Sequence, residues 1–118
     1  PIQPMLAKID NINDVPGIME YVANQMKMGD FSMVAPYISA DQKNSSMNIL
    51  HLSQTGLGLP DRDYYFKEDP SVIEIQNAYK TYLTKLFELT GDANAEANAA
   101  TVYAIEKKLA ETTTASVL

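Results

Sequence analysis

The sequence predicts a mostly α-helical fold of antiparallel helices with one small β-hairpin. Apolar side chains recur at helical spacing in two long stretches, residues 70–90 and 95–109. Residues 47–54 have instead the period of two that is typical of a strand. Two glycines and a proline in residues 56–60 separate these patterns and mark a bend between them.

The N-terminal sequence predicts a short segment, either helical or irregular, followed by a longer helix. Residues 5–10 form either a short helix or an irregular arm. The longer helix begins near Pro16, which suits a first turn, and either Asn13 or Asp14 caps it. Gly29 is placed to end this helix. Its expected inner face consists of Ile18, Val22 and Met26, with Met19 beside them.

The hairpin is predicted from residues 31–54. Residues 31–40 are apolar and extended, with Pro36 confined to an edge or a bulge, and residues 41–46 make a polar turn. In residues 47–54 both faces carry apolar side chains, so we expect a strand that is covered on both sides. A two-stranded hairpin is not stable alone, and it should therefore lie on helices. The two faces of this strand are Met47, Ile49, His51 and Ser53, and Asn48, Leu50, Leu52 and Gln54.

The stretch around which the chain is organised is residues 56–66, Gly-Leu-Gly-Leu-Pro-Asp-Arg-Asp-Tyr-Tyr-Phe. Its glycines can adopt backbone angles that other residues rarely tolerate, and Pro60 stops any regular element from continuing. Arg62, the chain's only arginine, lies between two aspartates. Three aromatic residues follow, and the tyrosine hydroxyls need partners if they are buried.

The last two helices have clear start and stop signals. Asp69 caps the first, in competition with a capping box formed by Ser71 and Glu74. Gly91 ends it and Asp92 caps the next helix, so the connection is tight and the helices should pair antiparallel. The expected stripes are Val72, Ile75, Tyr79, Tyr82, Leu83 and Leu86 on the first helix, and Ala95, Ala99, Val102, Ile105 and Leu109 on the second.

Composition narrows the class of protein. The chain has 118 residues and a net charge of −6, without the basic patch that nucleic-acid binding needs. It has no cysteine, which excludes disulfides and thiolate metal sites. No apolar run approaches the about 20 residues of a membrane-spanning helix.

The run Gly-Leu-Gly-Leu-Pro-Asp-Arg-Asp-Tyr-Tyr resembles the conserved block in the N-terminal portion of the neprilysin family of zinc metalloendopeptidases, which includes the bacterial oligopeptidase O enzymes. Residues 41–46, Asp-Gln-Lys-Asn-Ser-Ser, resemble the family's Asp-x-Lys-Asn-Ser segment. The acidic helix that ends at Leu89-Thr90-Gly91 fits too. The resemblance covers nearly the whole chain and is most specific over residues 41–91. Family members are much longer, so we expect residues 1–118 to be one partial domain of a longer chain.

The resemblance implies an architecture and a function. The family has two largely helical lobes around a closed cavity, of which one resembles thermolysin and holds zinc. The other covers the cavity and admits only short peptides, and these residues resemble part of that covering lobe. The implied role is a non-catalytic segment that works by excluding large substrates and water. Its expected partners are the remainder of the parent chain and, for the parent, short peptides. The family resemblance alone implies an extracytoplasmic location, periplasmic or at the cell surface. The lack of cysteine favours a bacterial member, because animal members have disulfide-bonded ectodomains.

The family's zinc site requires a helix bearing His-Glu-x-x-His, because two imidazoles one turn apart bind the metal and the glutamate activates its water. His51 is the only histidine of this chain. We therefore predict no catalytic, cofactor-binding or metal-binding residue here, and zinc only in the implied parent. The excerpt alone should not hydrolyse peptides.

Several residues have both a structural and a functional interpretation. His51 is a packed histidine bonded to a neighbour, or else a substrate contact. Asp61 and Asp63 hold an ion pair with Arg62 and cap backbone donors, or else form an acid–base pair. Gly56 and Gly58 resemble a phosphate loop only superficially, without its third glycine and lysine. We favour the structural interpretation in each case.

Three further patterns are expected to be structural or fortuitous. The tyrosines are core or interface residues rather than a stacking platform, and the methionines are core fillers or contacts with missing parts of the parent. The Asn-Ser-Ser at residues 44–46 matches a glycosylation acceptor, a pattern common by chance. The tyrosines and methionines concerned are Tyr64, Tyr65, Tyr79, Tyr82 and Tyr103, and Met19, Met26, Met28 and Met33.

Two other hypotheses stay open from the sequence. In the first, the chain is a free-standing binding or scaffold module that presents residues 56–66 to a partner. In the second, it is a complete small enzyme of another kind. A downstream His-Glu-x-x-His in the gene would favour the peptidase, and a stop codon the module. If the chain is an excerpt, it should expose apolar faces and self-associate.

Overall fold

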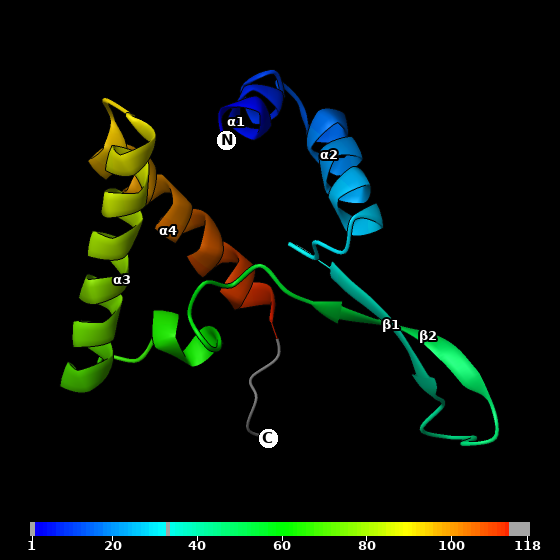
Figure 1. Ribbon diagram of the computed structural model, residues 1–118. Coiled ribbons are helices and arrows are strands. Elements are labelled where there is room, and N and C mark those ends of the chain that lie inside the picture. Colours follow the sequence, from blue (N-terminus) through cyan, green and yellow to red (C-terminus); the bar gives the residue numbers. More distant parts are fainter. Residues whose placement is uncertain (1, 33, 114–118) are drawn as a thin grey trace. The chain divides into compact units, whose positions relative to one another are not determined.

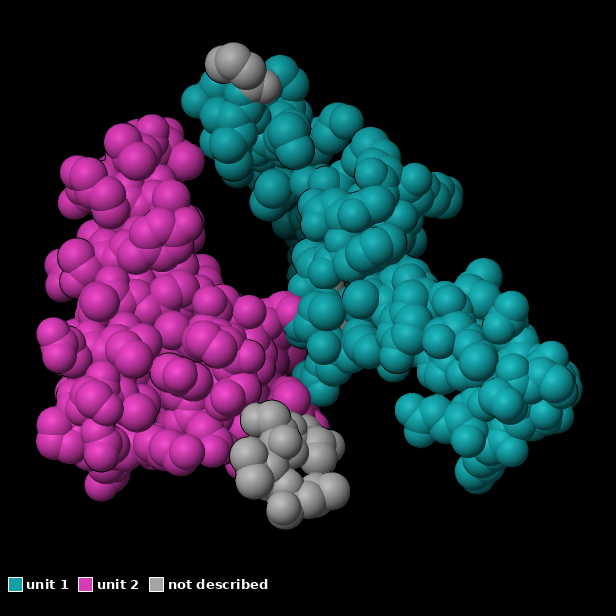
Figure 2. Space-filling view, turned by 60° about the horizontal axis from the view of Figure 1, so that its bottom comes forward, with its two compact units in different colours: residues 1–55 teal, residues 56–118 magenta. Residues whose placement is uncertain are grey.

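The computed structural model describes residues 2–32 and 34–113, and within them it is mainly helical with one antiparallel pair of strands (Figure 1). This confirms the predicted fold class. The chain divides into two compact units, residues 1–55 and residues 56–118, which Figure 2 distinguishes by colour.

The first unit begins with two helices, α1 (Gln3–Asp10) and α2 (Val15–Lys27). Asp14 caps α2, since its side chain accepts a hydrogen bond of 2.8 Å from the backbone N–H of Gly17. Gly29 follows the C-terminal end with a positive φ of 87°. The alternatives left open for the short segment and for the cap are thus resolved in favour of a helix and of Asp14.

The strands β1 (Val34–Ala40) and β2 (Asn48–Gln54) form the predicted hairpin. Tyr37 is paired with His51, and Pro36 with Leu52. Each strand is an edge of this two-stranded sheet, which is where a proline without an N–H is tolerated.

One face of the hairpin is apolar and open to solvent. Residues directly opposite each other in an antiparallel pair lie on the same face, and so do alternate residues along each strand. Leu52 is 67% exposed, although a strand covered on both sides was expected. Covering of this face therefore stays a prediction for a longer protein. The exposed apolar residues of this face are Val34, Ile38, Leu50 and Leu52.

The second unit contains the short 3₁₀ helix η1 (Arg62–Tyr65) and the helices α3 (Pro70–Thr90) and α4 (Ala95–Thr112). Asp69 caps α3 by accepting hydrogen bonds from the backbone and the hydroxyl of Ser71, which favours the aspartate cap over the competing capping box. Gly91 ends α3 with a φ of 82°. The helix α3 packs along α4, and η1 contacts both.

The start of α4 differs from the prediction. Asn94, not Asp92, is the N-cap residue, and its side chain makes no capping hydrogen bond. Asp92 instead accepts from the backbone N–H of Asn94 at 2.7 Å and from the Asn98 side chain at 2.7 Å. The predicted tight connection is present, but Asp92 stabilises the turn before the helix.

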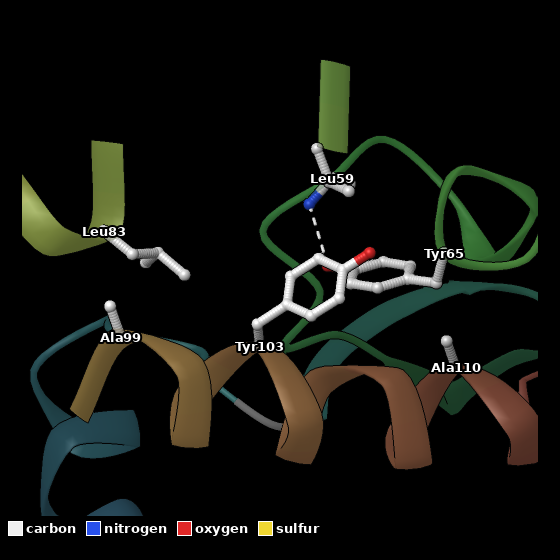
Figure 3. Close-up of a cluster of buried hydrophobic side chains, with 6 residues drawn as sticks. All are labelled: Leu59, Tyr65, Leu83, Ala99, Tyr103 and Ala110. Carbon is white, nitrogen blue, oxygen red and sulfur yellow. Dashed lines mark hydrogen bonds between the residues drawn. The ribbon is translucent and has the colours of Figure 1, made fainter. Parts of the chain in front are cut away.

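The inward faces of α3 and α4 are rotated relative to the predicted stripes. Ile75 and Leu86 of α3 and Ile105 of α4 are exposed. Phe87 packs inward on α3, and Tyr103 is buried on α4. Helical spacing alone predicted a broad stripe and could not show which part of it faces the partner helix. The buried cluster (Figure 3) consists of Leu59, Tyr65, Leu83, Ala99, Tyr103 and Ala110.

Candidate functional site

The glycine-rich loop is fastened to α3 and α4 through one tyrosine. Tyr65 ends η1 and is only 1% exposed. Its hydroxyl oxygen accepts a hydrogen bond of 3.1 Å from the backbone N–H of Leu59, which Figure 3 shows as a dashed line. The same hydroxyl donates to Oε2 of Glu106 on α4 at 2.9 Å. The loop thus folds back on its own aromatic anchor, and the anchor is tied to α4.

A second tyrosine reaches the same carboxylate. Tyr79 of α3 donates from its hydroxyl to Oε1 of Glu106 at 2.9 Å. Glu106 therefore joins the loop and both helices, with each oxygen accepting one phenol hydrogen. Hydrogen bonds to a charged acceptor are stronger than those between neutral groups. We call the residues Gly58, Leu59, Tyr65, Tyr79 and Glu106 the tyrosine–glutamate cluster.

Gly58 belongs to this cluster for reasons of space. A Cβ at this position would overlap the hydroxyl and the ring of Tyr79. Gly91 shows the contrasting case, because a positive φ favours glycine there while the space around it is open. The second glycine of the Gly-Leu-Gly-Leu sequence is thus explained by a contact with a residue 21 positions later in the sequence.

The cluster shifts the acidity of its phenols. Burial, together with the Glu106 carboxylate, raises the pKa of Tyr65 to about 12. Burial and the hydrogen bond to Glu106 also raise the pKa of Tyr79, and burial raises that of Tyr103. Both tyrosines that bind Glu106 stay protonated at neutral pH and act as donors. The arrangement holds protons in place and is not suited to proton abstraction by a phenolate.

The charged residues of the loop do not pair as predicted. Asp63 forms its ion pair with Lys67, at 2.9 Å, and not with Arg62. The hydrogen bond from Lys67 is the main reason that the pKa of Asp63 is lowered. Asp61 caps η1 by accepting from the backbone N–H of Asp63 at 2.8 Å, which confirms the predicted capping role. The predicted Arg62 ion pair is wrong for the described residues, because both neighbouring carboxylates are engaged elsewhere.

Arg62 packs on an aromatic ring instead. Its guanidinium carbon lies 5.6 Å from the centre of the Phe66 ring, and the Lys107 ammonium lies 5.3 Å from the same centre. The Nε of Arg62 is buried and has no hydrogen-bond partner among the described residues. These contacts hold Phe66 beside α4.

His51 lies in the first unit, on β2. Its ring stacks on Tyr37 with centroids 5.0 Å apart and planes 9° apart. The packed interpretation is thereby supported, but the expected bond to a neighbour is absent on Nε2, which is buried without a partner in the described residues.

The remaining candidates have structural surroundings. The ring and hydroxyl of Tyr79 occupy the space beside Gly58, so this loop does not offer the open backbone cradle of a phosphate site. Asn44 accepts hydrogen bonds from the backbone and the hydroxyl of Ser46 at the hairpin turn. Met19 and Met28 are exposed, so they are not core fillers within this chain. Met33 lies outside the described residues.

The residues present do not fit a zinc ion. Among residues 2–32 and 34–113, no group of three or more histidine, cysteine, aspartate or glutamate side chains is arranged to hold a metal. The single imidazole is stacked on Tyr37, and Glu106 is occupied by two phenols. No helix in the described part of the chain is both long and apolar enough to cross a membrane.

Glu106 was not singled out from the sequence. It lies on the same face of α4 as Ala99, Tyr103 and Ala110. These four residues follow one another at intervals of four, three and four positions, which is helical spacing. A lone carboxylate on an otherwise apolar helical face is the signal that could have identified it, because such a group requires buried donors. Its partners come from other elements and could not be assigned by local spacing.

Comparisons with known proteins place the chain in a family. The model for the N-terminal part of peptidase family M13 matches residues 1–117. Endothelin-converting enzyme 1 of Cavia porcellus is 36% identical over 88 residues, which are 75% of this chain and 11% of that protein. Neprilysin-3 of Drosophila melanogaster is 38% identical over 78 residues, 64% of this chain and 10% of that protein. The chain therefore spans only about a tenth of the length of these relatives.

Solved structures show the same relationship. The zinc metalloprotease Zmp1 of Mycobacterium tuberculosis, solved by electron cryomicroscopy in an open state, matches with a TM-score of 0.79 and 28% identity. This match covers 98% of the present chain and 19% of Zmp1. A crystal structure of Zmp1 with an inhibitor matches with a TM-score of 0.76 over 93% of this chain.

The fold and the tyrosine–glutamate cluster define a mainly helical segment in which packing and hydrogen bonding fix the glycine-rich loop. The matches then assign the family: the chain belongs to peptidase family M13. The resemblance inferred from residues 41–91 is confirmed, and the matched enzyme Zmp1 is a zinc metalloprotease.

Proposed function

We propose that residues 1–118 are a non-catalytic part of a longer M13 zinc metalloendopeptidase that cleaves short peptides. In this proposal they contribute to the lobe that encloses the active-site cavity. That lobe keeps folded proteins and bulk water away from the reacting peptide bond. The residues belong to a single domain of the parent, and the zinc site is formed by other residues of it.

The tyrosine–glutamate cluster is the observation that carries this proposal. The most family-specific residues of the chain, the Gly-Leu-Gly-Leu-Pro-Asp-Arg-Asp-Tyr-Tyr run, are engaged in holding a loop against two helices. A catalytic motif leaves reactive groups accessible, whereas here the carboxylate and both phenols bind one another. Family membership together with this use of the motif supports a structural role within a metallopeptidase.

Exposed apolar surface gives a second support. Large apolar side chains lie open on α2, on the hairpin and on α3 of this chain. A soluble monomer rarely exposes extensive apolar patches that have no partner. Such surfaces are expected where a segment packs against the remainder of a larger protein.

Extracytoplasmic placement in a bacterium is part of the proposal. A bacterial source is supported by the structural similarity to a mycobacterial enzyme, whereas the extracytoplasmic location rests on membership of family M13. Under this proposal the parent does not depend on disulfides in this segment for its stability.

The test compares the 118-residue chain with the full product of its gene. We expect the full product to contain zinc and to cleave short peptides, and we expect a chelator to abolish the cleavage. The 118-residue chain should neither retain zinc nor cleave, because it lacks the paired imidazoles. Metal content by mass spectrometry and cleavage of a fluorogenic peptide measure both properties.

The control is the full product with the glutamate of its His-Glu-x-x-His changed to glutamine, which should keep zinc and lose cleavage. Peptide cleavage by the 118-residue chain that survives a chelator would overturn the proposal. A gene that ends at codon 118 would do so as well, in favour of a free-standing scaffold module.

A further inference from the structure

The helix α3 carries a second apolar stripe beside the one that faces α4. Tyr82 is 56% exposed and Leu89 is 74% exposed. Ile75 and Leu86 lie on the same stripe and are also exposed. The core side of α3 is formed by Leu83 and its neighbours instead. The second stripe, Ile75, Tyr82, Leu86 and Leu89, is called the outer seam.

The spacing of the outer seam is that of a helix-packing surface. Together with Tyr79, its residues follow one another at intervals of four, three, four and three positions. This is the a and d pattern of a heptad repeat, in which apolar residues meet a partner helix. A sheet or an irregular segment would not require this repeat. The spacing therefore indicates that the missing partner is a helix.

The outer seam is continuous with an interface already formed in this unit. Tyr79 binds Glu106 of α4 on one side, and its ring lies 6.2 Å from the ring of Tyr82 on the other. The remaining surface of α3 is mostly polar, with Ile73 as an exposed apolar residue outside the two adjoining stripes. The polar residues of that surface are Glu74, Asn77, Thr81, Lys85 and Glu88.

We infer that the outer seam binds an amphipathic helix of the same polypeptide, from outside residues 1–118, which packs beside α3 and α4. This inference rests on the proposed function. The matched region is 19% of the Zmp1 chain, so about four-fifths of that relative lies outside it and a comparable length is available in the parent to supply the helix. Continuity with the α3–α4 interface favours a permanent intramolecular partner over a transient one.

Thiol labelling tests the inference because the 118 residues contain no cysteine. Leu86→Cys places a thiol on the outer seam, and Asn77→Cys places one on the polar side of the same helix as a matched control. Each is made in the 118-residue chain and in the full gene product, in a background where other cysteines are replaced. Modification by a thiol reagent is followed over time under native conditions.

We expect Leu86→Cys to react rapidly in the 118-residue chain and at least about tenfold more slowly in the full product, since a buried thiol reacts only through local opening. Asn77→Cys should react at a similar rate in both. Tyr82→Cys repeats the test if the first variant folds poorly, as judged by circular dichroism. The helix that covers the outer seam should then be located in the full product by cross-linking from the protected thiol.

Equal reactivity of Leu86→Cys and Tyr82→Cys in both proteins would overturn the inference. Protection in the 118-residue chain that grows with its concentration would overturn it as well, in favour of a second copy of the chain. Peptidase activity of the full product is measured in parallel. An active product with an unprotected seam refutes this inference alone, whereas an inactive product without zinc refutes the proposed function.

Discussion

Residues 56–113 close a core around Tyr65, while residues 2–55 bury one large side chain, Val22, within the described part of the chain. The first unit takes its secondary structure from local signals, such as the Asp14 cap and the hairpin ladder. The second adds bonds between distant residues, since Tyr65 and Glu106 are 41 positions apart. The first unit also joins distant residues, since its hairpin pairs Val34 with Gln54, but the contacts between distant residues of the second unit bury a cluster of side chains. A core therefore requires packing between elements as well as the caps and ladders that form them.

Among the changes that test this difference between the two units, Gly58→Ala is expected to have the largest effect on stability. The added methyl group overlaps Tyr79 and disturbs its bond to Glu106, so the second unit should lose about 3 kcal/mol of unfolding free energy. Urea unfolding followed by tyrosine fluorescence measures the loss. Gly91→Ala is the control, with an expected cost of about 1 kcal/mol for its left-handed backbone angle alone. Similar midpoints for both variants would show that the contact at Gly58 is unimportant.

An intermediate effect is expected from alkaline pH. The pKa of Tyr65 is raised in the folded chain to about 12, from 10.0, so folding favours the protonated phenol. This stabilisation is complete below about pH 10 and is lost as the pH rises towards 12, at up to about 1.4 kcal/mol per pH unit. Unfolding measured across this range should show the decline. Tyr65→Phe should be less stable at neutral pH and should decline less steeply, and parallel profiles would refute the assignment.

The smallest effect is expected from Asp14→Ala in the first unit. Loss of the cap on α2 should cost about 1 kcal/mol of local helix stability and reduce helix content slightly. Circular dichroism and amide hydrogen exchange of α2 measure this change. The unfolding transition of the second unit should stay in place, because Asp14 makes its hydrogen bond within its own helix. A shift of that transition would mean that the two units are energetically coupled.

Local features of the fold could be predicted from the sequence. Asp69, Gly91 and the turn before residue 47 each act within a few positions, so spacing and residue type were sufficient. The alternatives at Asn13 and Asp14 could not be separated, because both residue types cap helices equally well. Family membership was also evident from residues 41–91.

Long-range partners could not be predicted in this way. Arg62 was paired with its sequence neighbours, but Asp63 binds Lys67 one turn further on and Asp61 accepts from a backbone N–H. Glu106 was overlooked because its donors, Tyr65 and Tyr79, come from two other elements. The inward faces of α3 and α4 were misplaced for the same reason, since the apolar stripe of α3 is wide enough to serve two neighbours.

The open hairpin has a consequence for biosynthesis. Translation proceeds from the N-terminus, so residues 34–54 leave the ribosome before α3 and α4 are complete. The nascent chain then presents Ile38, Leu50 and Leu52 together with unpaired strand edges, which other chains can join. In the proposed longer protein, residues synthesised later would have to cover this face to prevent such joining.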